Sequence, residues 1–276
     1  MKVISVVNTK GGSGKSTLAT NLAAIAASEG KRVMLIDADG KQASSLSFRQ
    51  LRYATNEKIK EENKGKVKSE QKETYAEFTA QSLPSNLIFQ EVKNYEASFD
   101  YIIIDAGAGD NNIVRSAIAA AAYGILVIPC QPSAYDLFGT TDTLDLLKAC
   151  RVTLDIDAVI VLNMVFADKR IKILKDVDET LLELTDTYDV ERLNTNITNY
   201  ITYKYSTTKG LSVVEYDSAS KAAAEMMDLY KKENMSPFSG CLSTIAQFIL
   251  LISIFYMVRC PLTYMEKINN DQINTY

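Results

Sequence analysis

The sequence contains no histidine among its 276 residues. Imidazole acid–base chemistry and histidine metal sites are therefore excluded. Cysteine is also scarce, and no two cysteines form a C-x-x-C pair: the four are Cys130, Cys150, Cys241 and Cys260. This spacing predicts reduced thiols in a cytosolic protein rather than a disulfide framework.

An excess of basic charge is absent as well, since the formal net charge is −4. Any contact with DNA would therefore need a local basic patch. The N-terminus leads directly into a strand-like run, so we expect no secretory signal peptide. The length and the apolar content of 47% suit one large α/β domain with an ample core.

A glycine-rich stretch at residues 10–17 organises the rest of the sequence. It reads Lys-Gly-Gly-Ser-Gly-Lys-Ser-Thr and lies between an apolar run at 3–7 and a helix-like run at 18–27. Strand, glycine loop and helix form the context of a phosphate-binding loop. Its backbone N–H groups and the helix N-terminus would face an anion. We expect Lys15 to reach the β- and γ-phosphates and the Ser16 hydroxyl to ligate Mg²⁺.

Acidic residues follow two later strand-like runs. Asp37 and Asp39 come after the run at 32–36, and Asp105 ends the run at 99–104. Carboxyl ends of parallel strands share one edge of an open α/β sheet, where ligands bind. Two aspartates beside a phosphate loop favour Mg²⁺ binding and positioning of the attacking water, and we expect Asp105 to hold Mg²⁺ through Ser16 or water. A helix cap is the alternative role for an aspartate at a strand end.

The order of these runs predicts an α/β fold of the P-loop NTPase type, with a mostly parallel central sheet and helices on both faces. Further strands are expected at 124–129, 157–163 and 190–194, with a short edge strand at 87–89. The expected helices cover residues 16–29, 113–122, 136–150, 170–186 and 217–232.

A charged helical segment is expected at about 49–78, within a polar stretch at 43–78. Between Glu57 and Glu73 it holds six lysines and five glutamates. Mixed charges at helical spacing indicate a solvated face with i,i+4 ion pairs. An appendage that faces DNA or an adaptor protein is the alternative interpretation.

With Lys10 ahead of its first glycine, the loop reads K-G-G-x-G-K-[ST]-T. This resembles the deviant Walker A box of the ParA/MinD (SIMIBI) ATPases. From Met1 to about Glu233 the order of motifs is similar to that of the ParF-like plasmid partition ATPases. The other matching stretches are 105–109, 128–137 and 203–215.

The resemblance implies an ATPase of weak intrinsic activity that uses ATP and Mg²⁺. Lys10 would act across a dimer on the partner's phosphates, and Asp39 would carry the catalytic role beside Lys15. The family's D-x-D-P-Q stretch is altered here, because Gly40 replaces the proline. The implied ATP-binding residues are Lys10, Gly11, Gly12, Ser13, Gly14, Lys15, Ser16 and Thr17, with Pro132 and Asn163 lining the pocket for the nucleotide base. The implied metal residues are Ser16, Asp37 and Asp105, with Asp37 supporting the metal or its waters.

The same resemblance implies a cytoplasmic, nucleoid-associated partition switch. ATP binding would close a sandwich homodimer that coats non-specific DNA or assembles into a polymer. A centromere-bound adaptor similar to ParB or ParG would stimulate hydrolysis and reset the cycle. Basic residues available for DNA are Lys204, Lys209 and Lys221, with Arg192 and Lys172 as neighbours. Such side chains are more often plain solvated surface.

The composition changes after Glu233. We expect residues 1–233 to form the ATPase domain and 234–276 an apolar C-terminal extension. Within the extension, 241–258 has only four polar residues and a marginal length for a membrane span. Three interpretations of the extension stay open. It could be a membrane-associated helix, a helix packed on the domain or in a dimer interface, or an extension without a selected role.

Three further functions are weighed against partition. A MinD-like positioning ATPase would work at a membrane through 241–258. A P-loop metabolic or metal-insertion enzyme would need a substrate pocket or a cysteine pair, and the sequence offers neither. A non-catalytic scaffold is disfavoured because Lys10, Lys15, Ser16, Asp39 and Asp105 are all present.

Overall fold

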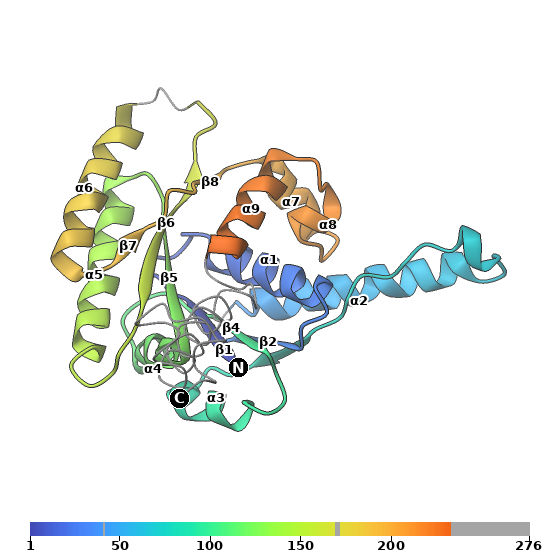
Figure 1. Cartoon of the computed structure of the whole chain (residues 1–276), viewed down its shortest axis with the longest axis horizontal. Helices are drawn as coiled ribbons and strands as arrows, with labels where there is room; N and C mark the ends of the chain where they lie inside the picture. The colour runs from blue at the N-terminus through green and yellow to red at the C-terminus, as the bar shows by residue number, and fades with distance from the viewer. Residues whose placement is uncertain (41, 169–171, 233–276) are drawn as a thin grey trace, which may run out of the picture. The chain divides into compact units, whose positions relative to one another are not determined.

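The computed structural model describes residues 1–40, 42–168 and 172–232, and the following account is limited to them. Residues 1–230 form one compact unit around a sheet (Figure 1). The predicted tail, 234–276, with its 241–258 segment, lies outside the described residues.

The sheet is parallel throughout its described pairs, with the order β3-β2-β4-β1-β5-β6-β7 and β8 paired to β6. The predicted parallel α/β architecture is therefore confirmed. The strands are β1 (Lys2–Val6), β2 (Val33–Asp37), β3 (Thr79–Ser82), β4 (Tyr101–Asp105), β5 (Gly124–Cys130), β6 (Ala158–Val165), β7 (Glu191–Arg192) and β8 (Ile197–Thr198).

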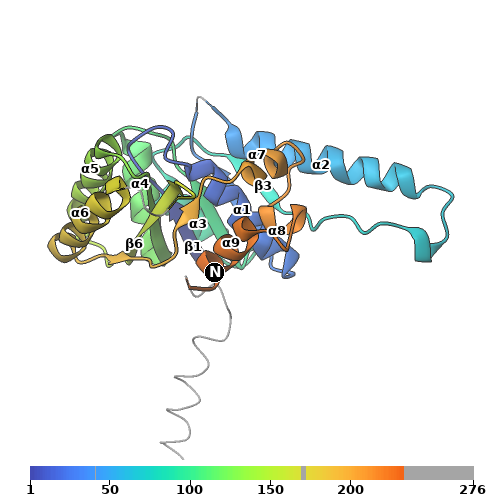
Figure 2. The same ribbon diagram turned by 90° about the horizontal axis from the view of Figure 1, so that it is seen from above.

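Helices cover both faces of the sheet (Figure 2). α1, α2 and α8 pack together on one face, and α3, α4, α5 and α6 form a contiguous layer on the other. The helices are α1 (Lys15–Ser28), α2 (Ser44–Asn63), α3 (Ile88–Asn94), α4 (Asn112–Ala120), α5 (Ala134–Cys150), α6 (Lys172–Tyr188), α7 (Ile201–Thr207), α8 (Val213–Tyr216) and α9 (Lys221–Lys232), with 3-10 turns at Lys68–Glu70 and Ala121–Tyr123.

The central strands are buried from both sides. Every residue of β2 and β4 is buried, which suits their nearly continuous apolar runs, because helices on both faces leave no solvated side. The parallel register sets Asp37 of β2 beside Asp105 of β4, and Val6 of β1 on the other side of Asp105. The two acidic strand ends and the start of the glycine loop therefore meet at one edge of the sheet.

The charged helix is shorter than predicted. α2 ends at Asn63, so the predicted helical segment at about 49–78 is wrong over residues 64–78. This return segment runs back along α2 and contains the 3-10 turn at Lys68–Glu70 (Figure 2). Gly65 has a φ of 80°, a left-handed conformation that interrupts the helix. The Asn63 side chain then bonds to the backbone N–H and C=O of Lys72, at 2.9 and 2.8 Å, and holds the return segment.

The predicted edge strand at 87–89 is also wrong, because this stretch leads into α3. Ile88 and Val92, four residues apart, are both fully buried, which fits a helix face and not the alternation of a strand. The strand at this edge of the sheet is β3 instead, and it pairs in parallel with β2.

Arg52 of α2 is fully buried and ties this helix to a distant part of the chain. Its guanidinium forms a bidentate ion pair with Glu215, at 2.9 and 2.6 Å. It also donates to the carbonyl oxygens of Gly210, at 3.1 Å, and Ala76, at 2.8 Å. Gly210 has a φ of 64° and lies against the Arg52 backbone so closely that a Cβ would collide with it. α2, the return segment and α8 therefore pack as one unit.

We expect Arg52→Ala to lower the free energy of unfolding by about 3–5 kcal/mol, because Glu215 would stay buried without its partner. Arg49→Ala on the same helix is the matched control. Arg49 pairs with Glu77 at 3.2 Å in a partly exposed position, where an ion pair contributes less than about 1 kcal/mol. Urea unfolding measures both variants, and equal losses would contradict the structural role of the buried pair.

A candidate nucleotide-binding site

The glycine loop leads from β1 into α1 with an open helix N-terminus. Gly12 and Gly14 have φ values of 82° and 90°, which residues with a Cβ rarely adopt. Gly14 is the N-cap of α1, and no side chain caps this end within the described chain. The first N–H groups of α1 are therefore available to an anion, as phosphate-binding loops require.

Lys15 lies across its own loop. Its Nζ donates to the carbonyl oxygen of Lys10 at 2.9 Å, and the side chain is largely buried. Burial lowers the pKa of Lys15, and the negative charges of Asp105 and Asp39 oppose that shift. An ammonium has three N–H donors, so this geometry suits a group that also binds phosphate oxygens.

Asp105 is the buried acid of the site. Its Oδ2 accepts a hydrogen bond from the Ser45 hydroxyl at 2.7 Å, whereas Oδ1 has no hydrogen-bond partner in the described chain. Burial raises the pKa of Asp105 to about 6, although the Ser45 and Ser16 hydroxyls lower it; Asp37 adds to the increase, and Lys15 opposes it.

A buried carboxylate oxygen without a partner, near a serine hydroxyl, fits a hydrated Mg²⁺ ion. No group of three or more acidic or cysteine side chains is placed to hold a metal anywhere in the described ranges. Mg²⁺ bound with a nucleotide usually takes its other ligands from phosphate oxygens and water.

Asp37 acts as a helix cap, the alternative role considered for it. Its Oδ2 accepts from the backbone N–H groups of Ser45, at 2.9 Å, and Leu46, at 3.3 Å, and its Oδ1 accepts from Asp39 N–H at 3.2 Å. Burial raises the pKa of Asp37, and these three N–H donors oppose the increase. Its predicted support of the metal or its waters stays a prediction.

Asp39 lies between two loops that meet at the sheet edge. Its backbone lies against Gly107 of the segment after β4, where a Cβ would be 3.6 Å from the Asp39 Cα. The Asp39 Oδ1 accepts from the backbone N–H of Gln42 at 3.4 Å. Asp39 is also near enough to Lys15 for its charge to raise the pKa of that lysine. The structure thus brings the predicted catalytic carboxylate to the phosphate loop.

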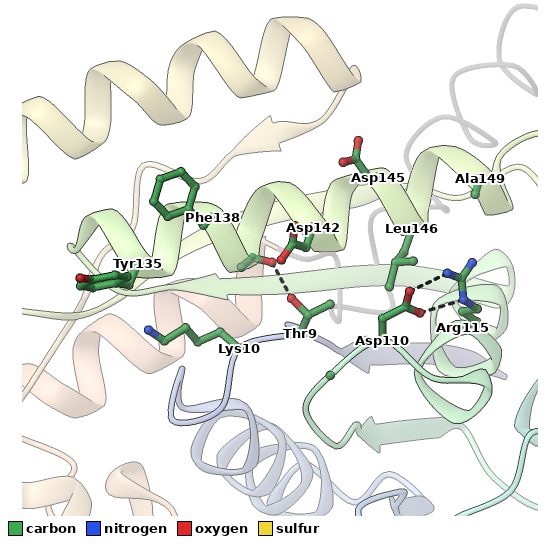
Figure 3. Close-up of a pocket in the computed structure, with 12 residues that line it drawn as sticks. Thr9, Lys10, Asp110, Arg115, Tyr135, Phe138, Asp142, Asp145, Leu146 and Ala149 are labelled. Atoms are coloured by element: carbon green, nitrogen blue, oxygen red, sulfur yellow. Dashed lines mark hydrogen bonds and ion pairs between the residues drawn. The ribbon is translucent and has the colours of Figure 1, made fainter.

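Lys10 points away from its own loop. Its Nζ lies 5.4 Å from the centre of the Tyr135 ring on α5 (Figure 3). The same Nζ lies 3.8 Å from Oδ2 of Asp136, the next residue of α5. The side chain is 36% exposed and lines an open groove of about 820 Å³ together with Tyr135 and Phe138. These two aromatic residues are 75% and 68% exposed. Lys10 is therefore presented to the outside of the molecule.

Thr9, the residue before Lys10, fixes the position of Lys10 against α5. Thr9 Oγ1 donates to the carbonyl oxygen of Gly139 at 2.9 Å, and Thr9 N–H donates to Thr143 Oγ1 at 3.0 Å. A Cβ on Gly139 would lie 2.7 Å from the Lys10 Cβ. Glycine in α5 thus permits the close approach that directs the Lys10 side chain into the groove.

A second cavity, of about 410 Å³, lies beside α1 and is suited to a nucleotide base. Its lining residues are Thr17, Asn163, Met164, Ile197, Thr198, Asn199, Tyr200, Tyr203, Lys204 and Thr207. Asn163 also donates from Nδ2 to the Ser13 carbonyl oxygen at 2.8 Å, which fixes it to the loop. Pro132 is buried and is not among the lining residues. The structure therefore brings Asn163 to this cavity but not Pro132.

Two residues at the site were missed from the sequence. Gln131 donates from Nε2 to the Gly12 carbonyl oxygen at 2.5 Å, and its place beside Pro132 in a family-like stretch could have signalled it. Ser45 has no such signal, because a serine in a polar run carries no mark of burial.

The predicted basic residues do not all remain available. The Arg192 side chain is almost fully covered and bonds to Asp178 and Asn196, at 2.8 and 2.7 Å, so its proposed place in a DNA-binding patch is wrong. Lys204, Lys209 and Lys221 are exposed, on or between α7 and α9. The Lys172 side chain lies outside the description.

Comparison with known proteins identifies the family. The model of the family described as ATPase MipZ matches residues 2–151, more than half of the chain. The chain belongs to the MipZ family of ATPases. Its predicted membership of the ParA/MinD group and its predicted ATPase activity are thereby confirmed, whereas the narrower ParF-like assignment stays a prediction.

Relatives of this MipZ-family chain align with it over most of their own length. The sporulation initiation inhibitor protein Soj of Bacillus subtilis is 26% identical over 84% of the chain and 97% of Soj. The maintenance of carboxysome distribution protein A of Halothiobacillus neapolitanus is 25% identical over 80% of the chain and 91% of that protein. The septum site-determining protein MinD complexed with Mg-ADP from Pyrococcus horikoshii shares the fold, with a TM-score of 0.62, 19% identity and coverage of 87% and 98%.

A second family model, described as 60Kd inner membrane protein, matches residues 204–273. The first part of this stretch is α7 to α9 of the MipZ-family chain, and the rest lies outside the described residues. Within the described helices, none has the length and apolar character needed to cross a membrane.

The burial of Asp105 predicts a pH dependence of stability. Its pKa in the folded protein, about 6, lies above that of an exposed carboxyl, about 4. Folding therefore takes up a proton between these values, and the folded state loses stability as the pH rises from 4 to 6.

In Asp105→Asn this loss should be absent. The free energy of unfolding of the original protein should fall relative to that of the variant by up to about 3 kcal/mol across this range. Chemical unfolding of the nucleotide-free proteins at several pH values measures the difference. Parallel profiles would contradict the assignment.

Proposed function

We propose that this MipZ-family ATPase is an ATP-dependent switch for DNA partition that acts as a sandwich homodimer. The observation that carries the proposal is the position of Lys10. Its side chain is fixed by contacts with α5 and points into an open groove, away from the loop that Lys15 crosses. A lysine in this position is suited to a nucleotide held by a second copy of the chain, where it would neutralise transition-state charge as an arginine finger does.

The other proposed roles follow from the positions of the residues at the edge of the sheet. The N–H groups of the glycine loop and Lys15 would bind the phosphates of ATP, and Ser16 with Asp105 would hold Mg²⁺ directly or through water. The bound Mg²⁺ would neutralise charge that develops on the phosphate oxygens. Asp39 would orient the attacking water from its position beside Gly107. Asn163 and its cavity would receive the base, and the solved MinD complex with Mg-ADP supports this choice of ligands.

The similar proteins support a role in positioning or partition. One is named for carboxysome distribution and another is Soj. We favour DNA as the surface that the dimer binds, because Lys204, Lys209 and Lys221 are exposed in the same region of the chain. An adaptor similar to ParB or ParG would stimulate hydrolysis, polymers could form from the dimer, and the protein would be cytoplasmic and nucleoid-associated.

A MinD-like positioning function at a membrane is the second candidate. The match of residues 204–273 to the model of the 60Kd inner membrane protein favours it. The 241–258 segment that would carry this function lies outside the described residues. A liposome flotation assay on the full chain and on a chain ending at Glu233 separates the two candidates.

The proposed roles predict three different defects. Lys15→Ala should abolish ATP binding, because the β- and γ-phosphates lose their cation. Asp39→Ala should retain ATP binding and accumulate an ATP-bound dimer that does not hydrolyse. Lys10→Ala should retain ATP binding by the monomer but lose the ATP-dependent dimer. Nucleotide titration and size-exclusion chromatography with light scattering measure these outcomes, and equal loss of ATP affinity in all three would exclude this division of roles.

DNA binding provides a separate prediction. The ATP-bound protein should bind non-specific duplex DNA in a salt-sensitive manner, and Lys209→Glu and Lys221→Glu should each weaken it and reduce the salt slope by about 1. Lys148→Glu, an exposed position on α5, is the matched control. Unchanged DNA binding in both variants, together with flotation that requires 241–258, would favour the membrane function instead.

A further inference from the structure

Ser45 contacts both acidic strand ends through two different groups. Its hydroxyl donates to Asp105 Oδ2 at 2.7 Å, and its backbone N–H donates to Asp37 Oδ2 at 2.9 Å. The residue is fully buried in the first turn of α2. A buried hydroxyl aimed at a carboxylate forms a charge-assisted hydrogen bond, which is stronger than a neutral one.

The start of α2 depends on these contacts. Ala43, at its N-cap, supplies no side-chain cap and has a φ of 28°, which is strained for a residue with a Cβ. Asp37 from β2 accepts the first N–H groups of the helix in place of a local cap. Two turns later the buried Arg52–Glu215 pair fixes the same helix to α8. α2 is thus anchored at both points, and Ser45 is held against the sheet.

We infer that Ser45 is a positioning residue for the Mg²⁺ site of this ATPase, orienting the Asp105 carboxylate through its hydroxyl. By binding Oδ2, the hydroxyl restricts rotation of the carboxylate and leaves Oδ1, which has no partner in the described chain, for the ion or a water bound to it. The inference rests on the proposed role of Asp105 in holding Mg²⁺. It extends the site from the ends of the strands to the first turn of α2.

A purely structural role can be separated from this one. The cap of α2 uses the backbone N–H of Ser45, whereas the contact with Asp105 uses the side chain. Ser45→Ala removes the second contact and keeps the first. Ser44→Ala is the matched control, because the exposed Ser44 hydroxyl bonds to the Gln42 carbonyl oxygen at 3.2 Å and lies one position away.

The test measures the affinity of the full chain for a fluorescent ATP analogue, first without divalent cations and then as MgCl₂ is titrated. Ser45→Ala should leave the Mg²⁺-free affinity unchanged and raise the Mg²⁺ concentration at the midpoint at least roughly tenfold, the lower end of the range for a lost hydrogen bond to a charged group. Ser44→Ala should match the original protein. Thermal unfolding of each variant confirms that it is folded.

A wild-type Mg²⁺ midpoint in Ser45→Ala, or a loss of affinity that is equal with and without Mg²⁺, would overturn the inference. If Ser45→Ala does not fold, Ser45→Cys fills the same position with a slightly larger side chain and a weaker donor, and an unshifted midpoint in that variant would overturn the inference equally. The proposed function fails in a different way: ATP affinity of the original protein that does not respond to Mg²⁺ would exclude the metal site itself.

Discussion

The parallel register of β2, β4 and β1 is the constraint on which the site depends. It aligns Asp37 with Asp105 and Asp105 with Val6, after which the glycine loop begins. Because parallel strands end at the same edge, residues that are far apart in sequence become neighbours there. The cost of burying Asp105 at this edge is visible in its raised pKa, and the hydroxyls and the ammonium around it offset part of that cost.

α2 provides the second support of this edge. Its first turn is bound by Asp37 and Ser45, and its middle is bound through Arg52 to Glu215. On the other side, Asn21 of α1 accepts a hydrogen bond from the backbone N–H of Val213 at 2.8 Å. The two helices that begin at the site therefore both contact α8. Such satisfied buried polar contacts fix one arrangement of helices against the sheet, since breaking any of them leaves a buried group unpaired.

Lys10 and Lys15 are only five residues apart in one loop, but their side chains point in different directions. Lys15 begins α1 and lies along its own loop, whereas Lys10 is directed outward by the approach of Gly139. The groove beside Lys10 is bordered by exposed Tyr135 and Phe138. Exposed aromatic side chains of this kind are common at the centre of protein interfaces. The charge and the apolar surface thus lie together on one face of the molecule, which suits the proposed site shared between two copies.

Glycine spacing and apolar runs are local signals, so the sequence alone was enough to predict the phosphate loop, the parallel α/β fold and the acidic strand ends. It did not reveal that α2 ends at Asn63, since the break depends on Gly65 and on side-chain bonds to Lys72. Nor could it show the Arg192 side chain covered in its ion pair with Asp178, or Ser45 against Asp105. The sequence around a polar residue does not indicate whether that residue is buried, because tertiary packing determines which polar side chains contact each other.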